Sequence, residues 1–323
     1  MRRLLPALLP LAALLAAAPA GAQESYPSRP IRLVIPFPPG GVVDILARMV
    51  APRFGEGLKQ SVVIDNRGGA NGNIAVELVA KSLPDGYTLL FGQVSNLAVN
   101  PAIYPSVPFD PVKDLAPIGM IAATPQLLVV SSASRLATVA DMIAAAKASP
   151  GGLSFASSGQ GSLGHMAFEM MQLSAGIKLL HIPYKGAGPA LIDVMGGRAE
   201  LFVAAAPALL PHIRSGKLRA LAIMTANRKH DLPSIPTLSE QGFPGYESSN
   251  WFGLLARAGT PPAIIERLNA ELKATLETPD VRAKLEAEGA VVLGGTPAQL
   301  ASQLAVDLEK WKRVVKEAGI KIE

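Results

Sequence analysis

Short apolar segments recur along the chain and alternate with amphipathic stretches. An uninterrupted apolar segment of this length is typical of a strand buried on both faces of a parallel sheet. The pattern predicts eight strands, at 31–35, 61–65, 87–91, 126–130, 153–156, 178–182, 201–204 and 219–224. Because helical stretches lie between these strands, we expect an α/β fold built from mostly parallel sheets flanked by helices.

Capping residues locate several helix starts. Thr138 precedes an apolar helical stretch and Asp141 follows it by three positions, an arrangement typical of a helix N-cap. A threonine directly before a proline occurs three times toward the C-terminus, at Thr260, Thr278 and Thr296. Proline is favoured at the first helical position, so we predict helices at 261–277, 280–288 and 297–318. The apolar run 201–213 contains two prolines, and it predicts a strand end and a turn rather than a membrane span.

Two glycine-rich loops each join a predicted strand to a predicted helix. In the first loop the candidate binding residues are Phe37, Gly40, Gly41, Val42 and Asp44. In the second loop they are Ser157, Ser158, Gly159, Gly161, Ser162 and His165. A helix start presents unpaired N–H groups and the positive end of the helix dipole, and glycine lets the backbone approach a ligand closely. We expect two lobes that hold one small anion from opposite sides.

The second loop also matches two enzyme motifs in part. Its G-x-G-x-x-G spacing at 159–164 is the dinucleotide-binding fingerprint, but the acidic residue expected about twenty positions later is absent. Tyr184 and Lys185 occupy that region, so a smaller anion is favoured. Ser162 and His165 are spaced for one helix face, but no G-x-S-x-G elbow surrounds the serine. We identify no carboxylate partner for His165, and we favour a helix-capping serine and a partly buried histidine over nucleophilic catalysis.

Two charged residues each allow two interpretations. Asp44 lies in the first turn of a predicted helix, where it complements the helix dipole, and we favour this structural role over a ligand contact. A carboxylate inside an anion site would oppose binding. Lys185 is either a surface charge beside a turn or the cation of the cleft, and the sequence leaves these alternatives open.

Composition excludes several classes of site. The 323-residue chain has no cysteine, so disulfides, thiolate metal sites and a cysteine nucleophile are excluded. None of its four histidines has a carboxylate at ligand spacing, and we predict no metal and no cofactor. The net charge of +5 falls to +3 without Arg2 and Arg3, which is too weak for a nucleic-acid surface. Aromatic residues make up 5% of the chain, too few for a carbohydrate site of stacked rings.

Residues 1–22 have the organisation of a cleavable secretory signal. Arg2 and Arg3 precede the apolar segment 4–18, and small residues at 20–22 form the cleavage site. The apolar segment is short for a membrane span and contains two prolines, so a retained anchor is the lesser alternative. A folded exported chain without disulfides is expected in a periplasm.

Longer motifs carry a family resemblance over nearly all of the chain after the signal. They are VIPFPPGG at 34–41, DNRGGANGN at 65–73, SLPDGYT at 82–88, FDPVKDLAPI at 109–118, HIPYKG at 181–186 and PSIPT at 233–237. In these motifs and their order, the sequence resembles Bug-type proteins, the periplasmic solute-binding components of tripartite tricarboxylate transporters. The resemblance implies a two-lobed Venus-flytrap fold, with lobe 1 at 25–124 and 248–323, and lobe 2 at 125–247. The C-terminal helices are expected to pack on lobe 1.

The resemblance also implies a function and further site residues. Family members bind carboxylates such as dicarboxylates, amino acids or aromatic acids, and the chain is expected to bind one without chemistry of its own. The implied contacts beyond the two loops are Gln93, Ser95 and Asn96 in lobe 1, and Tyr184, Lys185, Gly186, Ala205 and Pro207 in lobe 2. Val42 and Val43 replace the small residue and threonine of many relatives, which makes one wall of the pocket more apolar.

We therefore expect a monomeric periplasmic protein that captures a small carboxylate and delivers it to the membrane subunits of a transporter. The alternative is a periplasmic sensor that presents its loaded state to a membrane receptor kinase, since fold and site would be the same. An exported hydrolase acting through Ser162 and His165 is a third hypothesis. No nucleic-acid partner is expected.

Overall fold

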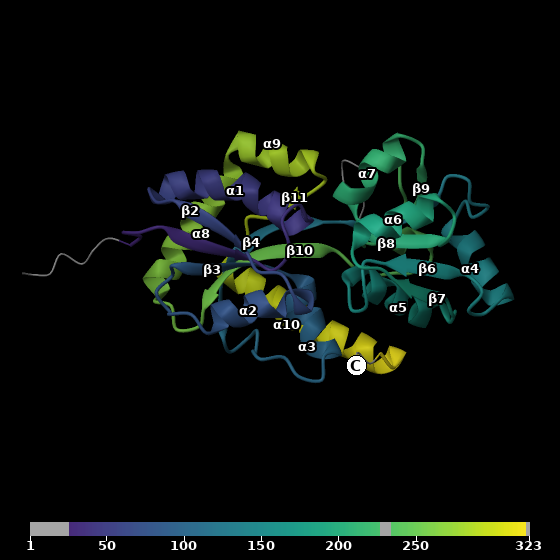
Figure 1. The fold of residues 1–323 in the computed structure, drawn as a ribbon, viewed down its shortest axis with the longest axis horizontal. Coiled ribbons are helices and arrows are strands. Elements are labelled where there is room, and N and C mark those ends of the chain that lie inside the picture. The colour runs from purple at the N-terminus through teal and green to yellow at the C-terminus, as the bar shows by residue number, and fades with distance from the viewer. Residues whose placement is uncertain (1–25, 227–233, 321–323) are drawn as a thin grey trace, which may run out of the picture.

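The chain folds into two α/β lobes side by side (Figure 1). This computed structural model describes residues 26–226 and 234–320, so the predicted signal peptide at 1–22 lies outside the described residues. The sheet of the first lobe has the order β11-β4-β10-β3-β1-β2, and the sheet of the second has the order β7-β6-β8-β5-β9. The first contains β1 (Ile31–Ile35), β2 (Val62–Asn66), β3 (Thr88–Gln93), β4 (Leu115–Thr124), β10 (Asn250–Arg257) and β11 (Val291–Val292). The second contains β5 (Gln126–Ser131), β6 (Ser154–Ser157), β7 (Leu180–Pro183), β8 (Leu201–Ala205) and β9 (Leu218–Ile223).

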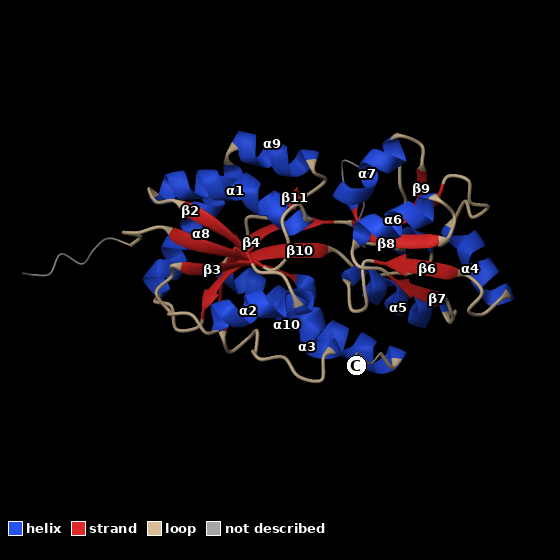
Figure 2. Ribbon diagram, viewed as in Figure 1, coloured by secondary structure: helices blue, strands red, loops and turns tan. Residues whose placement is uncertain are grey.

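Helices cover both faces of each sheet, which makes each lobe three-layered (Figure 2). One face of the first sheet carries α1 (Val42–Leu58), α8 (Pro262–Glu277) and α9 (Pro279–Ala287). Its other face carries α2 (Asn73–Ala80), α3 (Asn100–Ile103) and α10 (Pro297–Ala318). The faces of the second sheet carry α4 (Val139–Ala148) with α5 (Leu163–Ala175), and α6 (Ala187–Met195) with α7 (Ala206–Arg214). Single turns occur at η1 (Ala70–Gly72), η2 (Ser95–Val99) and η3 (Ser239–Gln241).

Both sheets are mixed, which corrects the expectation of mostly parallel sheets. Strand β10 is antiparallel to β3 and β4, and β5 is antiparallel to β8 and β9. Only Pro125 separates β4 from β5, so β5 starts where the chain enters the second lobe. Strand β10 likewise starts where the chain returns to the first sheet. These two strands therefore run away from the boundary between the lobes, whereas β1, β6 and β8 end at it.

The eight predicted strands all form, each within two residues of the predicted ends. Three strands of the described ranges were missed, namely β4, β10 and the two-residue strand β11. Pro117 and Gly119 interrupt the apolar pattern of β4, and Gly253 interrupts that of β10. The three C-terminal helices form within one residue of their predicted ends and pack on the first sheet, as predicted. The predicted turn at the end of the run 201–213 is wrong: the strand β8 is followed directly by helix α7.

The predicted caps differ in outcome. Thr138 forms a reciprocal capping box with Asp141, as predicted, and Thr296 forms one with Gln299. The hydroxyls of Thr260 and Thr278 are used differently. They donate to the carbonyls of Arg257 and Ala274, at 2.7 and 3.1 Å, and leave the helix starts uncapped by side chains.

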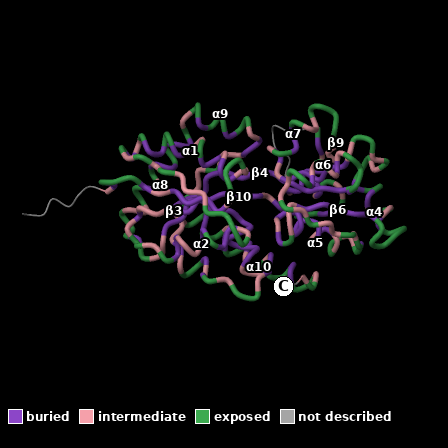
Figure 3. The backbone as a smooth tube through the Cα atoms, viewed as in Figure 1, coloured by how far each residue is buried: buried purple, intermediate pink, exposed green. Residues whose placement is uncertain are grey.

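The buried core consists of four apolar clusters, one on each face of each sheet. Buried positions follow the interior of both lobes along the chain (Figure 3). One of them crosses the boundary between the lobes. Leu163 and Met166 from the start of α5 pack in the same cluster as Trp311 of α10. Met166 and Trp311 have no exposed surface. The C-terminal helix thus supports the first sheet and also contacts the second lobe beside the start of α5 (Figure 1).

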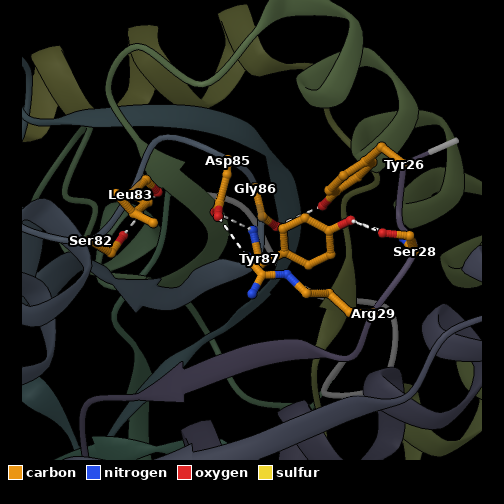
Figure 4. A network of polar contacts seen from close by, with 8 residues as sticks. All are labelled: Tyr26, Ser28, Arg29, Ser82, Leu83, Asp85, Gly86 and Tyr87. Atoms are coloured by element: carbon orange, nitrogen blue, oxygen red, sulfur yellow. Dashed lines mark hydrogen bonds and ion pairs between the residues drawn. The ribbon is translucent and has the colours of Figure 1, made fainter. Parts of the chain in front are cut away.

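The first described residues are fastened to the first lobe by aromatic and charged contacts (Figure 4). The Tyr26 hydroxyl donates to the Gly86 carbonyl at 2.6 Å, and its ring meets Tyr87 edge-on at 5.0 Å. Arg29 lies over the Tyr87 ring at 4.3 Å and pairs with Asp85 at 2.9 Å. Within the described ranges, none of the helices is both long and apolar enough to span a bilayer.

Candidate functional site

A cavity of about 620 Å³ lies between the two lobes. Its volume is in the range of small-molecule sites, about 300–1,000 Å³. The predicted residues that line it are Phe37, Gly40, Gly41, Val42, Gln93, Ser95, Ser158, Ser162, Gly186, Ala205 and Pro207. The predicted residues outside the lining are Asp44, Asn96, Ser157, Gly159, Gly161, His165, Tyr184 and Lys185. Val43, which was expected in a wall of the pocket, also lines the cavity. Lining residues that were not predicted include Leu46, Gln126, Leu163, Gly164, Ala187, Val203, Asn250 and Glu288.

Four helices begin at this cavity. Helix α1 comes from the first lobe, and α5, α6 and α7 come from the second. The N-caps of α1, α6 and α7 are Gly41, Gly186 and Ala205, which have no polar side chain to satisfy the first N–H groups. Four positive dipole ends therefore converge on one space without a lysine or arginine among the described residues that line it.

In the second glycine-rich loop, the glycine N–H groups donate to side chains of the same segment. The Gly159 N–H donates to Ser157 Oγ at 3.2 Å, and the Gly161 N–H donates to His165 Nδ1 at 3.1 Å. Both glycines have positive φ, 136° and 77°, so the loop requires glycine at these positions for its shape. Leu163 and Gly164 line the cavity as the first two residues of α5, and their N–H groups have no intrahelical acceptor because they lie in the first turn of the helix.

Two stacked histidines support this loop from behind. The rings of His165 and His181 lie 4.1 Å apart, and His181 also stacks on Phe155 at 4.6 Å. Burial, with a smaller contribution from His165, lowers the pKa of His181 to about 3, so this imidazole stays neutral. Its Nε2 lies 2.7 Å from Ser157 Oγ, which in turn accepts from Gly159. These contacts fix the shape of the loop.

The geometry around Ser162 does not support a nucleophile. As predicted, Ser162 is the N-cap of α5, and its Oγ accepts from the backbone N–H of His165 at 3.3 Å. The Nδ1 atom of His165 accepts from Gly161 and so is not placed to take a proton from the serine. Glu169 was not predicted as a partner, but its Oε1 lies 3.5 Å from His165 Nε2 one helical turn onward. This carboxylate lies beside the imidazole behind the loop.

Asp44 acts within the first loop and does not line the cavity. Its carboxylate accepts from the Gly40 N–H at 3.0 Å, from Arg48 Nε at 2.9 Å and from Asn66 Nδ2 at 3.0 Å. The hydrogen bond from Arg48 contributes most to lowering the pKa of Asp44 to about 2, with smaller contributions from Gly40 and Asn66. These bonds agree with the structural role favoured from the sequence.

Two other predicted residues outside the lining, Tyr184 and Asn96, also have structural partners. Tyr184 donates its hydroxyl to Asp193 at 2.8 Å, and Asn96 accepts from the Gln93 N–H at 3.2 Å. Lys185 is exposed outside the lining, which favours the surface interpretation left open by the sequence. Whether any of these residues contacts ligand stays a prediction.

Comparison with known proteins identifies the family. The sequence profile described as "Tripartite tricarboxylate transporter family receptor" matches residues 46–320. The chain belongs to this receptor family. The receptor is 41% identical to protein BugT of Bordetella pertussis over 308 residues, which cover 95% of this chain and 94% of BugT. This confirms the resemblance to Bug-type proteins, whose family consists of periplasmic solute-binding receptors rather than enzymes.

Solved structures similar to the receptor confirm the two-lobed fold. R. palustris Rpa4515, solved with adipate, is 39% identical with a TM-score of 0.84, and the match covers 92% of this chain and 99% of that one. MatC from Rhodopseudomonas palustris, solved with bound malate, is 29% identical with a TM-score of 0.80. That match covers 90% of this chain and 100% of MatC.

Asp44 is expected to make the receptor's stability depend on pH in the acid range. The pKa of its carboxyl is 3.8 in a free chain and about 2 when folded. A lowered folded pKa contributes stability above the unfolded pKa, and that contribution is lost as the pH falls through the folded pKa. Since Arg48 is half exposed, solvent screens part of the effect, and we expect Asp44→Asn to cost on the order of 1–2 kcal/mol at neutral pH. Urea unfolding of both proteins should show this difference shrinking as the pH falls from about 4 toward about 2.

Proposed function

We propose that the receptor captures a small carboxylate between its lobes and delivers it to the membrane subunits of a tripartite transporter. The observation that carries the proposal is the convergence of four helix N-termini on a cavity whose described lining includes neither lysine nor arginine. Backbone N–H groups and helix dipoles bind a compact anion without a side-chain cation. A carboxylate has two oxygens that accept from such donors.

Two relatives add support for this ligand class. The structures of Rpa4515 with adipate and of MatC with malate hold dicarboxylates. Membership of a transporter receptor family favours delivery to a transporter over presentation to a receptor kinase. The apolar residues Val42, Val43 and Leu46 line the first-lobe side of the cavity, so the ligand should have some apolar surface.

The same proposal includes location and organisation. We assign the receptor to the periplasm as a monomer, on the basis of its predicted signal at 1–22 and the periplasmic receptors of its family. The lobe boundaries that we propose are 25–124 with 248–323 for lobe 1 and 125–247 for lobe 2. The membership of the two sheets supports them, because the first takes its strands from 31–124 and 250–292 and the second from 126–223.

A thermal-shift panel tests the ligand class. Monocarboxylates, dicarboxylates, amino acids, neutral sugars and nucleotides are each added in excess to the receptor purified without bound ligand. A ligand that binds only the folded state adds about 2.7 kcal/mol to its stability at 100 times Kd, so carboxylates should raise the melting temperature. The corresponding alcohols and amides are the controls for each acid. Strong shifts only with neutral sugars or nucleotides would contradict the proposal.

A further inference from the structure

Four buried polar side chains lie on the cavity wall where the two lobes join. Gln93 ends β3, Ser95 begins the turn after it, and Gln126 and Asn250 begin the two strands that leave the boundary. Their exposed fractions are 7%, 4%, 3% and 6%. None of the four carries a charge, so the polar contacts that this part of the wall can offer a ligand are hydrogen bonds from neutral side chains.

Three of these side chains form a hydrogen-bonded row that leaves one acceptor unused. Asn250 Nδ2 donates to Gln93 Oε1 at 3.2 Å, and Gln93 Nε2 donates to Ser95 Oγ at 2.7 Å. Asn250 Oδ1 is buried and has no hydrogen-bond partner among the described residues. A buried acceptor without a donor is unfavourable, and at a cavity wall a ligand can supply the missing donor.

The charge of the lining favours a donor at this position. Glu288 is the one charged side chain among the described residues that line the cavity. The lining thus includes two residues with acceptor oxygens, Asn250 and Glu288. The positive ends of the helices are suited to hold the carboxylate. A plain alkyl carboxylate would leave Asn250 Oδ1 unpaired.

We propose that the ligand carries a hydrogen-bond donor, a hydroxyl or an ammonium group, in addition to its carboxylate, and that Asn250 is the residue that selects for it. This inference rests on the proposed function, since the carboxylate places the ligand in the cavity. Sites that bond a substrate hydroxyl or amine reject the analogue that lacks it, because the protein group is then left unpaired. Asn250 therefore determines specificity among carboxylates of one length.

Calorimetry with matched ligands tests the assignment. The acids are compared in three sets, and within each set they differ in a single substituent. The sets are butyrate, 3-hydroxybutyrate and 3-aminobutyrate; succinate, malate and aspartate; adipate, 2-hydroxyadipate and 2-aminoadipate. In the set that binds most tightly, a substituted acid should bind at least about tenfold more tightly than the plain acid. In Asn250→Leu the dissociation constants of the plain and the substituted acid should differ by less than about threefold, because the apolar side chain offers no acceptor. The affinity for the plain acid should change less than that for the substituted one.

Asn250→Asp is the matched control, because it keeps the shape and the acceptor. It should retain the preference for the amino acid over the plain acid, and circular dichroism and thermal melting should show that both variants fold. A plain acid that binds most tightly in every set would overturn the role of Asn250 while leaving carboxylate capture intact. The same holds for a preference that is unchanged in Asn250→Leu. If none of the nine acids binds, this inference fails, and the proposed function fails as well if no other carboxylate of the thermal-shift panel raises the melting temperature.

Discussion

Gly164→Ala is expected to remove most of the carboxylate affinity of the receptor without unfolding it. Gly164 is the second residue of α5 and lines the cavity. A Cβ atom at this position would lie 2.4 Å from the carbonyl oxygen of Val203 in β8, so the helix start has to move away from the sheet. Overpacking of this kind costs about 1–3 kcal/mol of stability. Misaligning the N–H groups of Leu163 and Gly164 with a charged ligand costs on the order of 3 kcal/mol, or about 100-fold in affinity.

Gly188→Ala is the matched control for this variant. Gly188 is also the second residue of a helix that starts at the cavity, α6, but a Cβ atom added there would have no described atom within 4 Å, and the residue is outside the lining. Alanine there should keep the affinity and raise the stability by up to about 1 kcal/mol. Calorimetry with the tightest carboxylate and urea unfolding measure both quantities. Unchanged affinity in Gly164→Ala would show that the start of α5 is not part of the binding site.

Asp307→Ala is expected to cost about 3–5 kcal/mol of stability, because it breaks a buried charged network. Asp307 is 1% exposed and accepts from Trp251 Nε1 at 2.6 Å and from Gln303 Nε2 at 2.8 Å. Lys310 Nζ lies 2.5 Å from its other oxygen and also donates to the Glu247 carbonyl at 3.4 Å. The network ties α10 to β10 and to the segment that leads into it. Its loss leaves the indole N–H and the lysine without their shared partner.

Asp280→Ala is the control, because it removes a paired carboxylate that is exposed rather than buried. Asp280 pairs with Lys284 at 2.8 Å on α9, but 70% of its side chain is exposed. An exposed pair near a helix start contributes about 0.5–1 kcal/mol. Urea unfolding at neutral pH, followed by the fluorescence of Trp251 and Trp311, compares the two variants. A loss in Asp307→Ala no larger than in Asp280→Ala would mean that the buried network does not stabilise the fold.

The elements of the fold that depend on local pattern were predictable. Strands such as β1 and β8 follow from short apolar runs, and α4 and α10 follow from the caps at Thr138 and Thr296. Strand β4 could not be predicted, because Pro117 and Gly119 interrupt its apolar pattern. The strand forms because its pairing with β10 and β11 stabilises it whatever its own strand propensity. Strand β10 likewise forms because it pairs with β3 and β4, although its own sequence did not predict a strand.

The two loops and the helix starts that follow them could also be predicted from the sequence, because glycines between an apolar segment and a helical stretch form a local pattern. The roles of individual residues within them were not all predictable. Gly161 was expected to offer its N–H to an anion, but His165 accepts that N–H, and the free donors lie at Leu163 and Gly164. The sequence places His165 near the loop but does not give the direction of its ring, which stacking on His181 decides.

The sequence by itself determined the family, the order of most strands and helices, and the two loops that flank the cavity. Only the tertiary structure decided which groups meet there. Asn250 and Gln93 are 157 positions apart, and Trp251 and Asp307 are 56 apart, yet each pair is joined by a hydrogen bond. Periodicity and capping act over a few residues, whereas these contacts arise because the chain crosses twice between the sheets and brings distant strand ends together. The convergence of four helix starts on one cavity has the same origin.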